Sequence, residues 1–227
     1  DHLGIGPAID GDAIYNGALD NAIGVAALLE VARAFKALPA PPRRSILFVA
    51  VTGEEKGLLG SEYFTAHPTV PLDHIVANVN IDGVTANWEV HDVVALGAEH
   101  SSLARQVDAA AAAVHLVVSP DPDPPQVYFI RSDQYSFVRH GIPAIFPGSG
   151  FLDAKGGRDV YRKLSDAWAE HHYHRPSDQW GPSYRAEWTL PELRFHFLVG
   201  LAIANAPAKP TWNPGDVFGT FVKAPLQ

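Results

Sequence analysis

The feature that most constrains the fold is an apolar run, residues 45–51, followed closely by two adjacent carboxylates, Glu54 and Glu55. A run of this composition predicts a buried parallel strand, and residues 58–66 behind it predict a helix. The carboxylates then lie at the carboxyl end of a central strand, where ligands bind in open α/β sheets. A solvated loop with two acids is the ordinary alternative, so the interpretation depends on the rest of the chain.

Composition restricts the class of protein. The 227 residues, 47% of them hydrophobic, suit one large domain or a domain with a tail. No apolar run approaches the ~18 residues of a membrane span. A net charge of −8 without a basic stripe argues against nucleic-acid binding. The absence of Cys excludes disulfides, thiolate zinc sites and a Cys nucleophile, and it is compatible with an extracytoplasmic enzyme.

The alternation of strand and helix patterns predicts a three-layer α/β/α sandwich around a mixed, mostly parallel sheet. We expect one domain over residues 1–206 and a Pro-rich tail over 207–227, either packed on the domain or extended. The Gly-rich residues 1–14 are predicted to form a loop. Helices are expected over 16–38, 58–66, 101–113, 132–140, 158–169 and 190–206, and strands over 45–51, 74–81, 93–96, 115–118 and 142–146.

Candidate metal ligands recur where the predicted strands and helices end. Besides Glu54 and Glu55, Asp82 follows a second strand, Asp20 lies at the entry to the first helix, and His174 lies in a His-rich loop. A doubly wound sheet brings such points to one edge. Carboxylates and imidazoles together suit zinc or a related divalent ion. The chain has no His-Glu-x-x-His helix, which excludes a single-helix zinc protease.

Each of these residues also has an ordinary structural explanation when it is taken alone. Asp20 fits a helix N-cap, Asp82 with Gly83 fits a turn, and His174 fits a surface histidine. The case for a metal site therefore rests on their joint occurrence and on their order along the chain.

That order resembles the co-catalytic di-zinc aminopeptidase family, which includes bacterial leucyl aminopeptidases, glutamate carboxypeptidase II and, as a diverged branch, glutaminyl cyclases. The resemblance spans residues 1 to about 180. The segments that carry it are Asp1-His-Leu-Gly, Asn16-Gly-Ala-Leu-Asp20-Asn-Ala-Ile-Gly-Val, Thr52-Gly-Glu-Glu-Lys-Gly-Leu-Leu-Gly-Ser61, Asn80-Ile-Asp82, Arg131-Ser-Asp133 through Gly141-Ile-Pro143, and Tyr173-His174-Arg-Pro-Ser-Asp178.

The resemblance implies a role for each matching metal ligand. Asp20 would bridge two metal ions, with a cis peptide bond between Asp20 and Asn21 aiming its carboxylate. Glu55 and His174 would complete one metal site, and Asp82 would serve the other together with a histidine. Two Zn²⁺ ions are implied, although Mn²⁺ or Co²⁺ also suits a site rich in carboxylates.

The resemblance also implies the catalytic groups. Glu54 would be the general base, and Tyr173 matches the tyrosine that steadies the oxyanion in the carboxypeptidase branch. Asp133 would be a supporting residue. Asp1 matches the Asp of a His-x-Asp motif, which holds the ligand imidazole from outside the coordination sphere.

The start of the chain departs from the family pattern. The metal-binding histidine is expected two positions before Asp1, and His2 is out of register with it. The chain also contains no Met, so we interpret it as a fragment or processed chain, with any export signal further upstream. The strand that leads into the motif, and often a protease-associated domain, are then expected in the upstream part of the same protein.

These features predict a secreted or periplasmic zinc exopeptidase, an aminopeptidase that acts on peptides. Two alternatives remain open, a glutaminyl-cyclase-like acyltransferase and a non-catalytic binding module of the same fold. Side-chain preference is not predicted, because the pocket walls come from loops such as 119–131 and 147–157. The aromatic residues there, Tyr128, Phe129 and Phe151, are expected to pack in the core or to line the pocket.

Overall fold

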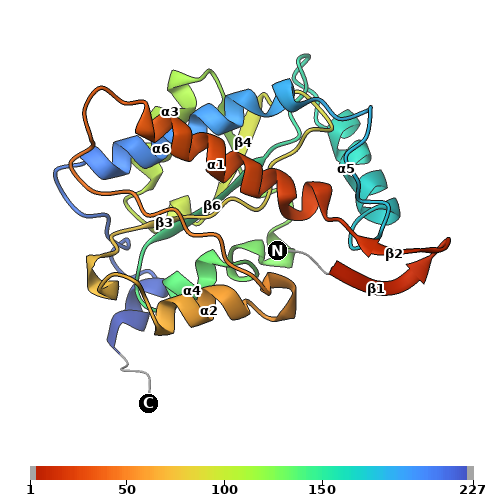
Figure 1. Cartoon of the computed structure of the whole chain (residues 1–227). Coiled ribbons are helices and arrows are strands. Elements are labelled where there is room, and N and C mark those ends of the chain that lie inside the picture. Colours follow the sequence, from red (N-terminus) through yellow and green to blue (C-terminus); the bar gives the residue numbers. More distant parts are fainter. Residues whose placement is uncertain (1–3, 224–227) are drawn as a thin grey trace.

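The computed structural model describes residues 4–223, which are built around a four-stranded sheet (Figure 1). The strand order is β3 (Asn78–Val79), β6 (Ala144–Ser149), β4 (Asp92–Leu96) and β5 (Val117–Ser119). β3 pairs with β6 and β4 with β5 in parallel, whereas β4 and β6 are antiparallel. The predicted α/β fold with a mixed, mostly parallel sheet is confirmed.

Helices cover both faces of this sheet (Figure 1). One face carries α1 (Ile23–Lys36), α3 (Ala104–Ala113) and α6 (Leu190–Asn205). The other carries α2 (Leu59–Ala66) and α4 (Gln134–Val138), and α5 (Asp159–His171) lies at one end. Short 3₁₀ turns lie at Glu54–Lys56, Leu72–His74, Ala98–His100, Pro124–Gln126, Tyr128–Ile130, Ala186–Thr189 and Phe218–Lys223. No helix within residues 4–223 has the length and apolarity needed to cross a membrane.

The main core lies between the sheet and the helices α3 and α6. Phe195 and Val199 of α6 are fully buried, as are Val93 and Ile145 of the sheet. Burying such side chains removes apolar area from water, at roughly 25 cal/mol per Å². The packing of α6 against the sheet therefore anchors β6, the strand that pairs with β3, whose segment leads to Asp82.

Residues 4–15 form a β-hairpin, so the loop predicted over residues 1–14 was wrong for the part that the structure describes, residues 4–14. β1 (Gly4–Ile9) pairs with β2 (Asp12–Tyr15) in antiparallel register, with Ile9 opposite Asp12. The two connecting residues, Asp10 and Gly11, have φ of 51° and 87°. Positive φ at both positions is what a two-residue type I′ turn requires, and Asp-Gly is a preferred sequence for it. The Gly-rich composition concealed this signal.

Residues 45–51 do not form the predicted buried strand. No backbone hydrogen bond joins them to a neighbouring segment within the described residues, and Leu47 is 48% exposed. They face residues 75–81 across a cavity of about 720 Å³, and β3, within that second segment, is the edge strand of the sheet. The apolar composition was interpreted correctly, but a strand also needs a hydrogen-bonded neighbour, which the described residues do not supply.

Candidate metal centre

Three of the predicted ligands, Asp20, Glu55 and His174, meet at the edge of the sheet where β3 ends. Nε2 of His174 lies 2.7 Å from Oε1 of Glu55 and 3.1 Å from Oδ2 of Asp20. One ligand atom from each residue lies within 4.8 Å of the other two. Residues far apart in the sequence are therefore brought into one site.

Local backbone geometry presents Asp20 to this site. The π-helical turn Ala18–Ala22 is broken at Asp20 and Asn21, whose φ and ψ are not helical, and the peptide bond between them is cis, as predicted from the resemblance. The Asn21 side chain donates to the carbonyl oxygen of Ile81 at 2.8 Å and accepts from the backbone N–H of Gly24 at 3.1 Å. These bonds tie the Asp20 turn to the end of the segment that carries Asp82.

Asp178 joins the Asp20 turn to the loop that carries His174. Its carboxylate is fully buried and accepts the backbone N–H groups of Leu19 at 3.0 Å and Asp20 at 3.1 Å. Its own carbonyl oxygen accepts the N–H of Ala18. Asp178 belongs to the segment Tyr173-His174-Arg-Pro-Ser-Asp178, which carries the family resemblance, but the resemblance implies no role for it. The motif itself was the only available signal, because these partners are about 160 positions away.

Glu54 and Asp82 line the same cavity as two of the three ligands, Asp20 and Glu55. Burial, followed by the nearby carboxylates of Asp82 and Glu55, raises the pKa of Glu54 to about 8. Burial also raises the pKa of Asp82 to about 7, although the Ser132 hydroxyl that donates to its Oδ2 at 2.7 Å opposes the rise. Crowded acids with raised pKa values are electrostatically unfavourable when all are ionised, and a bound cation would relieve this repulsion.

A divalent metal fits the residues of the site. Nε2 of His174 is a buried atom, and the two carboxylate oxygens beside it do not align with it as hydrogen-bond partners. Ligand atoms on one tetrahedral zinc ion lie roughly 3.3 Å apart, which is near the observed separations. Among residues 4–223 this is the only group of three such ligands, and Asp82 does not belong to it. Asp1 and His2 lie outside the described residues.

Tyr173 adjoins His174 at the rim of the site. The two rings stack with centroids 3.7 Å apart, and His174 has a positive φ of 57°. Burial, followed by the carboxylates of Asp20 and Glu55, raises the pKa of the Tyr173 phenol above its usual range. The phenol therefore stays protonated at neutral pH and can donate a hydrogen bond into the cavity.

Aromatic side chains contribute six of the residues that line the cavity, which has a volume of about 320 Å³. Of the residues for which two placements were open, Tyr128 and Phe151 line the cavity, whereas Phe129 packs in a buried cluster. Asp133, predicted as a supporting residue, does not line this cavity, and burial raises the pKa of its carboxyl. The aromatic residues that line the cavity are Trp88, Tyr128, Phe146, Phe151, Trp168 and Tyr173.

The chain is similar to known aminopeptidases. It is 39% identical over 74 residues to aminopeptidase YwaD of Bacillus subtilis strain 168, which covers 32% of this chain and 16% of YwaD. Its fold matches the zinc aminopeptidase BSAP from Bacillus subtilis with a TM-score of 0.63 and 22% identity, over 85% of this chain and 44% of BSAP. LapA of Legionella matches with a TM-score of 0.60 and 18% identity, over 86% of this chain and 50% of LapA.

The chain thus spans half or less of these relatives. The sequence pattern of one family, described as peptidase family M28, matches residues 1–193. The resemblance to zinc aminopeptidases is therefore confirmed over most of the chain, and the residues matched include Asp20, Glu54, Glu55, Asp82 and His174. The chain belongs to peptidase family M28.

Proposed function

We propose that this protein is a zinc-dependent aminopeptidase, an exopeptidase that removes N-terminal residues from peptides. The observation that carries the proposal is the convergence of Asp20, Glu55 and His174 at a cavity that is lined by Glu54 and by six aromatic side chains. A metal site with an adjacent base and an apolar pocket is the arrangement that peptide hydrolysis needs.

In this proposal Asp20, Glu55 and His174 hold one metal ion, and Asp82 shares Asp20 in holding a second. When bound, the metal pair acts as a Lewis acid toward water and the peptide carbonyl, and it provides a place for the free α-amine of the substrate. The roles of the protein groups follow from the positions of their side chains.

Glu54 is the proton carrier in this proposal. Its carboxylate lines the cavity beside Asp20 and Glu55, where it can accept a proton from the attacking water and return it to the leaving amine. Tyr173 donates a hydrogen bond to the oxygen that becomes negative as the carbonyl is attacked. The stacked ring of His174 holds that phenol in place.

An aminoacyl-anilide panel on the full-length protein, with metal analysis of the same sample, tests the proposed function. We expect anilide release that is lost with a chelator and restored by zinc. A zinc-loaded protein that cyclises N-terminal glutamine would be an acyltransferase instead, and one that turns over neither substrate would be a binding module. Either result would overturn the proposal.

We further propose that polypeptide upstream of Asp1 adds a strand between residues 45–51 and 75–81 and supplies the histidine for the second metal. The two segments lead to Glu54 and Asp82, so both run toward the metal centre. The cavity between them is lined mainly by apolar side chains, and its lining includes Nε2 of His196 and Oδ1 of Asn78, buried atoms that have no hydrogen-bond partner among the described residues. A strand there would supply backbone partners to both edges.

Hydrogen exchange tests this proposal about the upstream strand. The amides of residues 46–50 should be protected in the full-length protein and unprotected in residues 1–227 alone. Equal exchange in the two proteins would contradict it. We also propose an extracytoplasmic location, supported by the family resemblance and the absence of Cys, and cell fractionation with an antibody to the protein tests it.

A further inference from the structure

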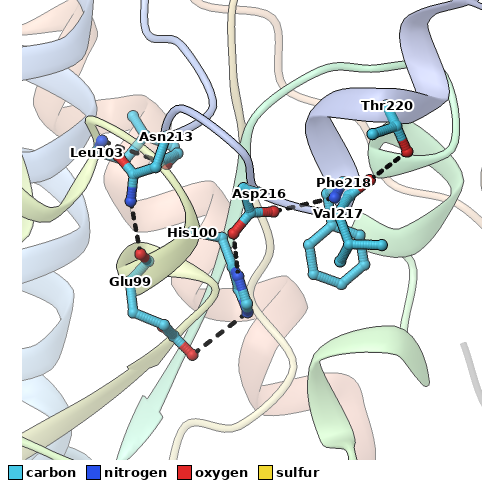
Figure 2. A network of polar contacts seen from close by, with 9 residues as sticks. Glu99, His100, Leu103, Asn213, Asp216, Val217, Phe218 and Thr220 are labelled. Atoms are coloured by element: carbon cyan, nitrogen blue, oxygen red, sulfur yellow. Dashed lines mark hydrogen bonds and ion pairs between the residues drawn. The ribbon is translucent and has the colours of Figure 1, made fainter.

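Residues 211–218, which we call the C-terminal clasp, pack against residues 97–103 (Figure 2). Trp212 forms an antiparallel bridge with Ser101, and the N–H of Asn213 donates to the carbonyl oxygen of His100 at 2.9 Å. The Asn213 side chain donates to the carbonyl oxygen of Glu99 at 2.8 Å. The clasp is therefore fastened through the backbone over several consecutive residues.

A histidine–aspartate contact closes the clasp. In Figure 2 the side chains of His100 and Asp216 point toward one another, and Nδ1 of His100 lies 2.7 Å from Oδ2 of Asp216. The other carboxylate oxygen of Asp216 accepts the backbone N–H of Phe218 at 2.9 Å. Asp216 thus contacts the His100 ring directly and holds the backbone of Phe218.

The rings of His100 and Phe218 enclose Phe129, which is 8% exposed. The His100 ring stacks on Phe129 with centroids 5.5 Å apart, and Phe218 meets it edge-on at 5.3 Å. A Cβ atom at Gly97 would lie 2.0 Å from the Phe129 ring, so the third side is closed by backbone. Two of the groups that hold Phe129 are therefore rings that the clasp positions, while the Gln134 side chain, which donates to the Phe129 carbonyl oxygen at 2.7 Å, holds its backbone independently of the clasp.

Phe129 belongs to the turn Tyr128–Ile130, in which Tyr128 lines the cavity of the proposed active site. Tyr128 and Arg131 line the cavity that contains Asp82, whereas Phe129 points into the cluster under the clasp. Because one short turn carries both, a shift of Phe129 must move Tyr128. The clasp touches none of Asp20, Glu54, Glu55 and His174 through any described contact, so it can affect the wall of the cavity without changing the metal ligands.

We propose that Asp216, acting through His100 and Phe129, is a positioning residue for Tyr128, and that Tyr128 contacts the side chain of the substrate residue that is released. The proposal rests on the proposed aminopeptidase function. The aromatic wall suits a large apolar side chain, because burial of apolar area drives binding in such a pocket. An alanyl side chain has a single methyl group and buries little area, so KM for an alanyl substrate should not depend on the position of Tyr128.

Kinetics of the full-length protein test the proposal. Asp216→Ala and Tyr128→Ala should each raise KM for phenylalanyl anilide by about tenfold, with kcat and zinc content close to the parent. KM for alanyl anilide should stay unchanged. Asp216→Asn keeps one acceptor oxygen, which can accept the N–H of Phe218, and its NH2 group can donate to Nδ1 of a neutral His100, so this variant should restore most of the parent KM. Glu30→Gln, which changes an exposed acid of α1 paired with Arg33, is the matched control.

Hydrogen exchange provides a readout that does not need activity. The amides of Ile130 and Arg131 donate within the turn 127–131, at 3.1 Å each. They should exchange faster in Asp216→Ala than in the parent, whereas amides of α1 should not change. Unchanged exchange in the turn, or an equal loss of kcat for both substrates, would overturn the proposal. A parent that hydrolyses nothing would end the aminopeptidase proposal, while the exchange result would still decide whether the clasp positions the turn.

Discussion

Ser132 donates a hydrogen bond of 2.7 Å from its Oγ to Oδ2 of Asp82, and the side chain of Asn80 donates to the same Ser132 oxygen at 3.0 Å. Ser132 is 4% exposed, so little water competes for these bonds. The carboxylate proposed to hold the second metal is therefore oriented by a side chain 50 positions away. Groups of this kind influence metal affinity without binding the metal.

Removal of the Ser132 hydroxyl should weaken the second metal site. We expect Ser132→Ala to lower affinity for the second zinc by about 10–100-fold, because Asp82 loses the bond that orients it. Affinity for the first zinc should stay unchanged. Titration of the full-length protein against a chelator of known affinity measures both. Ser183→Ala, in an exposed turn, is the control, and equal weakening of both sites would contradict the assignment.

Glu54 and Glu55 are adjacent in sequence, but substitutions at the two positions should have different effects. Glu54→Gln should retain zinc and lose about 10²–10⁴-fold in kcat, because the amide cannot accept a proton. Glu55→Gln should lose zinc affinity first, because Glu55 lies in the group of three ligands. Metal analysis and steady-state kinetics on both variants distinguish the two roles, and near-parent turnover in Glu54→Gln would remove Glu54 from its role.

Residues 1–227 alone should bind one zinc tightly and a second weakly. The tight site has Asp20, Glu55 and His174, whereas no second group of three ligands lies within residues 4–223. Calorimetric titration of zinc into this chain measures both affinities, and two equally tight sites would refute the expectation. In Asp20→Asn the tight site should weaken as well, because that carboxylate belongs to it.

The buried acid Glu192 should make stability fall with pH above about 6.5. Burial raises its pKa to about 8 from an ordinary value of 4.5, so the folded state retains a proton that the unfolded state has lost. Burial lowers the pKa of His196 to about 4 from 6.5, which has the opposite effect and offsets Glu192 at lower pH. Between pH 6.5 and 8 only Glu192 of this pair acts, and it should remove about 2 kcal/mol of stability.

Denaturant unfolding of the full-length protein and Glu192→Gln across this pH range measures the effect. The amide can still hydrogen-bond to Ser149, the partner of Glu192, but it does not titrate. We therefore expect a weaker pH dependence in the variant. Parallel curves for the two proteins would mean that Glu192 does not titrate in this range.

The sequence predicted what local patterns encode. Apolar periodicity identified the helices, and carboxylates at the ends of predicted strands and at the entry to the first helix identified Asp20, Glu55 and Asp82 as neighbours. It failed at residues 45–51, because strand formation depends on a partner as well as on composition. It also assigned no role to Asp178 or Ser132, because a hydrogen bond across 159 or 50 positions leaves no periodic signal. The clasp was not predicted for the same reason, because its contact between His100 and Asp216 joins positions 116 apart.

The open edges of residues 45–51 and 75–81 have a consequence for handling the chain. Apolar segments with unpaired backbone groups are templates on which another molecule can add a strand. Residues 1–227 prepared alone should therefore associate into larger species as their concentration rises, which light scattering would detect. Introduction of a lysine at Leu47 should reduce this association, because a charge on an open edge disfavours strand addition.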